Sequence, residues 1–169
     1  MHRLLLIAVL LMAGSAAAAS FEPPKRKSGL WEMKITSPQA RGQTVQQCID
    51  EKTDDLMKKQ MTENRQMQCS KNEMRREGDK IVAESVCKIQ NSTATTRAVF
   101  TGDFNSAYKA DIKSTYEPPI GNMKSAASTI EAKWLGPFKA GQKPGDVVVP
   151  GMPKTNMMDE MKKGASKRP

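Results

Sequence analysis

Cysteine is the residue type in this chain that offers the most chemistry. The sequence has three cysteines, Cys48, Cys69 and Cys87, all downstream of an N-terminal segment with the features of a secretory signal. In the oxidising compartments that exported proteins reach, paired cysteines form disulfides and an odd one is left as a thiol. Cys69 and Cys87 lie at equal distances from Gly78 in the sequence. We therefore expect a disulfide between these two across a β-hairpin and a free thiol at Cys48.

Most catalytic chemistry is excluded by the composition. The only histidine, His2, lies inside the signal segment, so the chain from Ser20 onward has no imidazole. Catalytic triads of the Ser-His-Asp type and histidine zinc sites need one. The chain also contains no G-x-S-x-G, no phosphate-binding glycine loop and no C-x-x-C. Acidic neighbours such as Asp54 and Asp55 are typical of solvated surfaces, and we predict a protein that is not an enzyme and holds no cofactor.

Methionine offers one metal hypothesis. Met57 and Met61 are one helical turn apart, and thioether sulfur is a ligand for Cu(I). Without a histidine to complete such a site, ordinary core packing explains these residues better. We predict no metal site.

Composition also divides the chain into segments. Residues 1–19 have an apolar run and a small-residue A-x-A end, which predicts a cleaved signal peptide. The run is shorter than the roughly 20 apolar residues that span a bilayer, which makes a retained anchor the weaker alternative. We expect a basic, proline-containing linker over 20–27, a β domain over 28–138, and a disordered tail containing Lys, Gly, Pro and Met over 139–169. The expected location is the periplasm, with the protein soluble after cleavage.

Alternation of apolar and polar residues predicts strands within the β domain. One helix interrupts them at about Thr53 to Asn64, where Thr53 can cap the helix and acidic residues follow it. The expected fold is mainly β: an antiparallel, curved meander of about six strands, forming a partial barrel, with one short helix. Besides the two strands of the cysteine hairpin, the predicted strands are Leu30–Thr36, Thr93–Thr101, Tyr108–Tyr116 and Lys124–Trp134.

The register of the cysteine hairpin depends on its loop. A three-residue loop, Glu77-Gly78-Asp79, places Cys69 opposite Cys87, where their sulfurs can bond. A two-residue turn at Gly78-Asp79 would instead place Cys69 opposite Lys88. We favour the disulfide because an exported protein meets an oxidising environment.

Several short motifs together resemble a known family. They occur in order as Gly29-Leu30-Trp31-Glu32, Cys48 before a short acidic helix, the Cys69…Gly78…Cys87 hairpin, Phe100-Thr101-Gly102-Asp103 and Trp134-Leu135-Gly136-Pro137. Their order and spacing resemble the domain-of-unknown-function 3617 family over about Lys27 to Phe138. The resemblance implies an exported bacterial protein with a signal peptide, a mostly antiparallel β domain and no established activity.

The same resemblance bears on Cys48. The family commonly has a cysteine where this chain has Phe138, which implies that Cys48 has lost its partner. It would then be an inert, partly buried thiol, or alternatively the site of an intermolecular disulfide.

Two functions follow from these features. An apolar small molecule or lipid could bind a concave β face, since curved sheets commonly form such sites. Alternatively, a structural or interaction module could use its basic surface and tail on anionic envelope lipid or on a protein, because the formal net charge is +9. Aromatic residues are too few for a nucleic-acid platform, and the oligomeric state is left open. The residues expected on the ligand face are Trp31, Ile35, Tyr108, Ile112, Tyr116 and Trp134.

Overall fold

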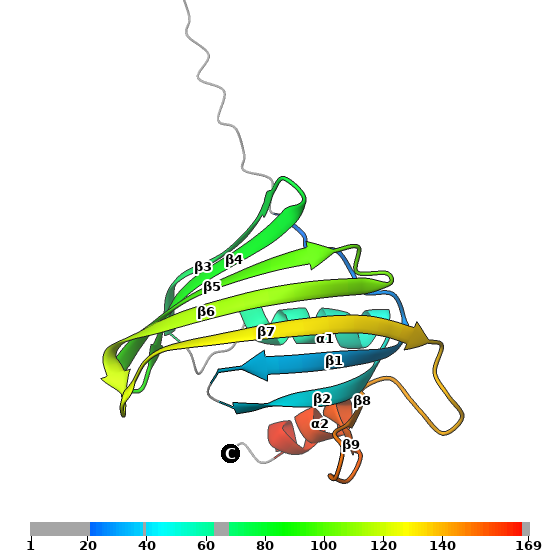
Figure 1. The fold of residues 1–169 in the computed structure, drawn as a ribbon. Coiled ribbons are helices and arrows are strands. Elements are labelled where there is room, and N and C mark those ends of the chain that lie inside the picture. The colour runs from blue at the N-terminus through cyan, green and yellow to red at the C-terminus, as the bar shows by residue number, and fades with distance from the viewer. Residues whose placement is uncertain (1–20, 39, 63–67, 167–169) are drawn as a thin grey trace, which may run out of the picture.

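The protein is described here by a computed structural model that covers residues 21–38, 40–62 and 68–166. The predicted signal peptide, residues 1–19, lies outside the described residues. Within them the chain forms nine strands and two helices (Figure 1). In chain order they are β1 Gly29–Ser37, β2 Ala40–Ile49, α1 Glu51–Thr62, β3 Gln68–Glu77, β4 Lys80–Ile89, β5 Ser92–Gly102, β6 Ala107–Ile120, β7 Met123–Gly136, β8 Asp146–Val148, β9 Thr155–Asn156 and α2 Met157–Ser166.

All nine strands belong to one antiparallel sheet in the order β3-β4-β5-β6-β7-β1-β2-β8-β9. The expected class, mainly β and antiparallel with a curved sheet, is confirmed. The expected number of about six strands and the single helix are wrong. The sheet stays open, with β3 and β9 at its two edges, and it curves around α1 (Figure 1).

The strand β2 was not predicted because its sequence lacks an apolar alternation. Its middle is polar, with Gln43, Thr44, Gln46 and Gln47 around Val45. It is nevertheless a strand because its backbone pairs with β1 on one side and β8 on the other. Pairing with β1 along the strand, and with β8 at Gln46 and Gln47, satisfies backbone N–H and C=O groups whatever the side chains are.

The helix α1 begins earlier than the predicted Thr53. The side-chain oxygen of Asp50 accepts a hydrogen bond from the Thr53 N–H at 2.8 Å, and the Thr53 hydroxyl accepts one from the Asp50 N–H at 2.8 Å. This reciprocal pair is a capping box, with Asp50 as the N-cap and Thr53 three residues into the helix. The cap is therefore Asp50.

The cysteine hairpin has a turn of a different length from the one we favoured. Glu77 pairs with Lys80, so Gly78-Asp79 is a two-residue turn and the three-residue loop is wrong. Ser70 is an extra residue in β3, so the register shifts by one residue between Cys69 and Lys71. This β-bulge brings Cys69 opposite Cys87.

The C-terminal segment folds onto the sheet, which differs from the disordered tail expected over 139–169. It supplies β8, β9 and α2, and its centre is a polar network around Asp146, which is 1% exposed. The Asp146 carboxylate accepts hydrogen bonds from the Asn156 amide at 2.8 Å, the Lys154 ammonium at 3.1 Å and the Lys143 N–H at 3.1 Å. Buried hydrogen bonds order this segment, and it contains few apolar residues. A search for apolar patterns in the sequence therefore does not reveal it.

In the described part of the chain, no helix has the length and apolar character needed to cross a membrane.

Candidate functional site

The predicted ligand-face residues lie on the same face of the sheet. Trp31 of β1 pairs directly with Trp134 of β7. Ala132 of β7 pairs with Tyr108 of β6 on one side and with Met33 of β1 on the other. Directly paired residues share a face, and every second residue of a strand returns to it. The same counting places Ile35, Ile112 and Tyr116 on this face, through their partners Ile130, Ser128 and Ala94. We call this the concave face, because α1 lies against it (Figure 1).

One end of the concave face is filled by its own side chains. Trp31 is 0% exposed and forms a core with Ile49 and Ala132. The Tyr108 ring lies 5.7 Å from the Trp31 ring and stacks on Phe104 at 5.1 Å, measured between centroids. Close packing of this kind fills the space between these rings. We call this end, where β1 begins and β7 ends, the closed end.

The segment before β1 crosses the closed end as a strap, which we define as residues 21–28. Both indoles donate hydrogen bonds to it: Trp31 to the Lys27 carbonyl at 2.8 Å and Trp134 to the Ser28 carbonyl at 3.1 Å. The Lys27 ammonium also lies 3.8 Å from the centre of the Trp134 ring, a cation–π contact. A side chain at Gly29, which has a φ of 142°, would collide with the Trp134 indole and the Gly136 carbonyl.

Arg26 of the strap joins α1 to the sheet. Its guanidinium donates to the Asp54 carboxylate at 2.7 Å, and the Arg26 backbone N–H donates to the same carboxylate at 3.1 Å. The guanidinium also reaches the Tyr108 hydroxyl at 3.5 Å and the Met57 sulfur at 3.2 Å. The Arg26 and Asp54 side chains are only 11% and 3% exposed, so the Arg26 charge depends on Asp54 for compensation, while Asp54 also lies 3.7 Å from the Lys58 ammonium.

Lys25 of the strap and Lys58 of α1 also join the strap to the helix. Lys25 lies 2.6 Å from Glu51 and 3.4 Å from Asp55, and the hydrogen bond to Glu51 is the main reason that its pKa is raised. In the other direction, the Lys58 ammonium donates to the Pro23 carbonyl at 3.1 Å. The basic residues expected in a linker therefore hold the acidic start of α1.

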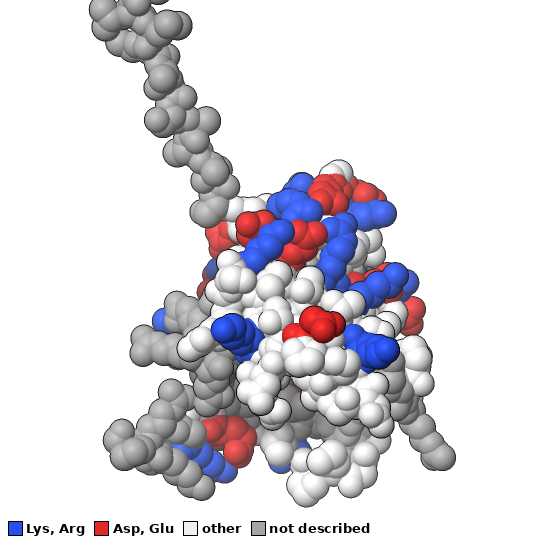
Figure 2. All heavy atoms as spheres, turned by 90° about the vertical axis from the view of Figure 1, so that its left-hand side faces the viewer, with Lys and Arg blue, Asp and Glu red and all other residues white. Residues whose placement is uncertain are grey.

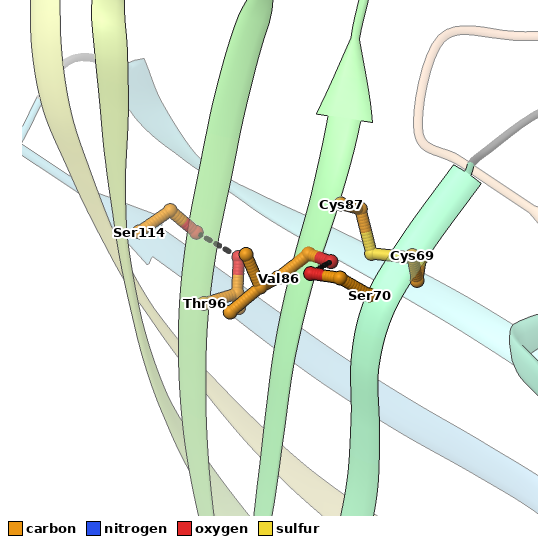
Figure 3. The surroundings of a disulfide bond; sticks show 6 residues. All are labelled: Cys69, Ser70, Val86, Cys87, Thr96 and Ser114. Atoms are coloured by element: carbon orange, nitrogen blue, oxygen red, sulfur yellow. Dashed lines mark hydrogen bonds between the residues drawn. A yellow bond between two sulfur atoms is a disulfide. The ribbon is translucent and has the colours of Figure 1, made fainter.

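The other end of the concave face is less completely covered. Ile35, Ile112 and Tyr116 are half-buried there, as are Tyr108 and Trp134 around the fully buried Trp31 at the closed end. The floor between them is made of small residues, and the Thr96 and Ser114 hydroxyls are hydrogen-bonded to each other at 2.8 Å (Figure 3). We call this region, near the turn between β6 and β7, the open end. The alanines of its floor are Ala94, Ala98 and Ala110.

The opposite, outer face carries a charged cluster over β3, β4 and β5. Glu84 accepts hydrogen bonds from Lys71, Arg75 and Arg97, and Arg75 also pairs with Glu77. Acidic and basic side chains gather over these strands at the top of Figure 2, whereas the middle of that view is mostly uncharged. Positive and negative groups alternate here, so these three strands carry a cluster of mixed charge.

The cysteines behave as the sequence indicated. Cys69 and Cys87 form a disulfide between β3 and β4 (Figure 3). Cys48 is free and 2% exposed, on β2 beside the C-terminal segment, where the Gly145 N–H donates to its carbonyl at 2.8 Å. Burial, followed by the nearby Asp146 charge, raises the pKa of the Cys48 thiol. A buried thiol with a raised pKa is a weak nucleophile.

Side chains that could bind a metal are not assembled in the described residues. No cluster there holds three metal-binding side chains of the His, Cys, Asp or Glu type. The Met57 sulfur accepts from Arg26, while the side chain of Met61 lies outside the described residues. A pocket of about 640 Å³ lies at the start of α1, and its lining is largely charged, including Glu51, Lys52 and Asp55.

The fold therefore defines a class: a small protein with one open, curved antiparallel sheet, closed at one end by a strap and a helix. The chain matches the family described as protein of unknown function DUF3617 over residues 26–137, and it belongs to that family. No curated protein and no solved structure is significantly similar to it.

Three of the sequence motifs, residues 29–32, 100–103 and 134–137, meet at the closed end. Trp31 and Trp134 pair there beside Gly29. Asp103 organises the loop that presents Phe104 by accepting hydrogen bonds from the N–H groups of residues 105–107. These bonds, those of Ser106 foremost, hold the Asp103 pKa well below its ordinary range. These three motifs thus build the closed end, whereas Cys87 of the cysteine hairpin pairs with Ala94 at the open end.

Proposed function

We propose that this protein is a non-enzymatic binding protein that takes an apolar ligand, such as a lipid acyl chain, at the open end of its concave face. The observation that supports this proposal is the group of half-buried apolar side chains beside a floor of small residues at the open end. These side chains are Ile35, Ile112 and Tyr116. Apolar side chains beside a floor of small residues suit a narrow apolar chain.

We also propose that the protein is exported and acts in the periplasm. The signal-like residues 1–19 and the disulfide between Cys69 and Cys87 support this location, because disulfides persist in oxidising compartments.

The alternative of a basic module that binds anionic lipid has less support. Lys25 and Arg26 are paired with the acidic start of α1, and Lys154 is paired with Asp146. These three basic groups are therefore already paired, although the chain keeps a formal net charge of +9.

A fluorescent fatty acid tests the proposal. Titrated into the purified protein, it should gain emission on binding, and unlabelled fatty acid should displace it. The Ile112→Asp variant should weaken binding by about tenfold or more, because a carboxylate beside the ligand would have to lose its water. Native mass spectrometry of the protein as purified would show whether a lipid is already bound.

Leu135→Asp is the matched control. Leu135 is an apolar residue of β7 at the closed end and is 42% exposed, so its replacement leaves the open end intact. This variant should bind the probe as the wild type does. Absence of binding by the wild type, or equal loss in both variants, would contradict the proposal.

A further inference from the structure

The strand β3 is an edge whose outer side pairs with no strand in the described part of the chain. The other edge, β9, is only two residues long and leads directly into α2, whereas β3 has ten residues. The disulfide from Cys69 to Cys87 fixes β3 to β4. A long, fixed edge strand is a template for pairing with another strand.

The hairpin determines which backbone groups of β3 face outward. The pair that closes a two-residue turn, here Glu77 and Lys80, is hydrogen-bonded, and hydrogen-bonded pairs then alternate along the ladder. Residues 71, 73, 75 and 77 therefore direct their N–H and C=O groups toward β4. Asn72, Met74 and Arg76 direct theirs away from it and are available to a partner.

The side chains of β3 alternate in charge along the outer face. They run Lys71, Glu73, Arg75 and Glu77, between the bulge at Ser70 and the turn at Gly78. If two copies of β3 pair antiparallel about Met74, Glu73 of each lies opposite Arg75 of the other, and Lys71 lies opposite Glu77. Opposite charges directly across a strand pair are stabilising.

The neighbouring registers do not have this property. Pairing about residue 73 places Glu73 opposite itself and Lys71 opposite Arg75. Pairing about residue 75 places Arg75 opposite itself and Glu73 opposite Glu77. Like charges directly opposite are destabilising. Only the register about Met74 matches the charges, uses the outward N–H groups of both strands, and fits the straight stretch between bulge and turn.

We propose that β3 is a self-complementary edge through which two copies of this protein form a dimer, with Met74 opposite Met74 of the second copy. The sheets of both copies then continue into each other, and their outer faces lie on the same side. Glu73 is available for this contact, since its side chain is 61% exposed and its ion pair with Lys71 is long, at 3.5 Å. This interface is separate from the proposed ligand site.

Charge variants test the register. Glu73→Lys places Lys opposite Arg75, and Arg75→Glu places Glu opposite Glu73, so each variant alone should dimerise about tenfold or more weakly than the wild type in sedimentation velocity. Mixed together, the two variants restore opposite charges at both positions and should form a mixed dimer. Recovery on mixing also shows that both variants are folded.

A backbone variant tests the edge itself. Met74→Pro removes an N–H that points away from β4, which an edge strand tolerates, and should abolish the dimer while the disulfide and the circular dichroism spectrum stay unchanged. Met74→Val keeps the N–H and should dimerise normally. A wild type that is monomeric at its highest soluble concentration, a Met74→Pro dimer as tight as the wild type, or charge variants that fail to associate on mixing would each overturn the proposal.

Discussion

At the scale of single residues, Glu84 makes the densest set of charged contacts on the outer face. Its carboxylate lies 3.1 Å from Arg75, 2.8 Å from Lys71 and 2.6 Å from Arg97. Hydrogen bonds from these groups, that of Arg75 first, lower the pKa of Glu84 to about 2. The carboxylate therefore links β3, β4 and β5 in its charged form.

This lowered pKa predicts that the contribution of Glu84 to the stability of the fold depends on pH. A carboxylate with a lowered pKa stabilises the fold above its unfolded value and loses that effect as the pH falls through the folded value. The wild type should therefore be more stable than Glu84→Gln at neutral pH, and the difference should shrink between about pH 5 and pH 2. Urea unfolding midpoints at several pH values measure it. Because the cluster is near the surface, high salt should reduce the difference, and a gap that is constant with pH would contradict this account.

Ser70 shows why the disulfide could be predicted although its loop could not. Pairing of Cys69 with Cys87 followed from their symmetry about Gly78 and the expectation of an oxidising compartment. The turn is one residue shorter than we favoured, and the bulge at Ser70 restores the facing arrangement. Sequence patterns do not mark a bulge between Cys69 and Lys71, because its stability comes from the disulfide and ladder around it.

At the scale of elements, the turn between β3 and β4 depends on Gly78. Its φ is 63°, and a Cβ added at this position would meet no atom within 4 Å. The backbone conformation, and not crowding by neighbouring atoms, therefore makes glycine favourable here. A positive φ at the first of two turn residues suits glycine and matches the twist of the flanking strands. The turn thus sets the register of the whole hairpin.

Gly78→Ala should destabilise the protein by about 1 kcal/mol, because a positive φ is unfavourable for alanine. The disulfide should still form, since the strands on either side are unchanged. Gly42→Ala is the control: Gly42 lies within β2 without a positive φ, and the nearest atom to an added Cβ is 3.7 Å away. Denaturant unfolding of both variants measures the effect, and equal stability of Gly78→Ala and the wild type would contradict the turn assignment.

The elements that could be predicted are those with an apolar and a polar face. β1, β5, β6 and β7 alternate, and their positions agree with the predicted strands within a few residues. Polar β2 and the short β8 are stabilised by backbone pairing and by hydrogen bonds to Asp146, which leave no periodic signal. The shared face of Trp31 and Trp134 was predictable from alternation, whereas the burial of one end by α1 and the strap required the tertiary structure.

At the scale of the whole molecule, the two faces of the sheet at β2 are covered by different parts of the chain. On the concave side, Ile49 packs with Trp31 at the closed end. On the other side, Cys48 and Leu30 are directly paired and both almost fully buried. Residues 143–158 lie beside Cys48, since Gly145 donates to its carbonyl and β8 pairs with β2. The C-terminal segment therefore completes the sheet.

Deletion of residues 139–169 tests whether this segment is part of the fold or a disordered tail. Without β8 and the Asp146 network, Cys48 loses its cover, and its thiol should react with a colorimetric disulfide reagent about tenfold or more faster in the native protein. In the full-length protein the thiol is 2% exposed and has a pKa raised by burial, so it should react slowly until denaturant is added. A Cys48→Ser variant of the deletion identifies the reacting thiol, because its fast reaction should disappear. If the deletion leaves both the reaction rate and the unfolding midpoint unchanged, the segment is dispensable and its hydrogen bonds do not hold the sheet.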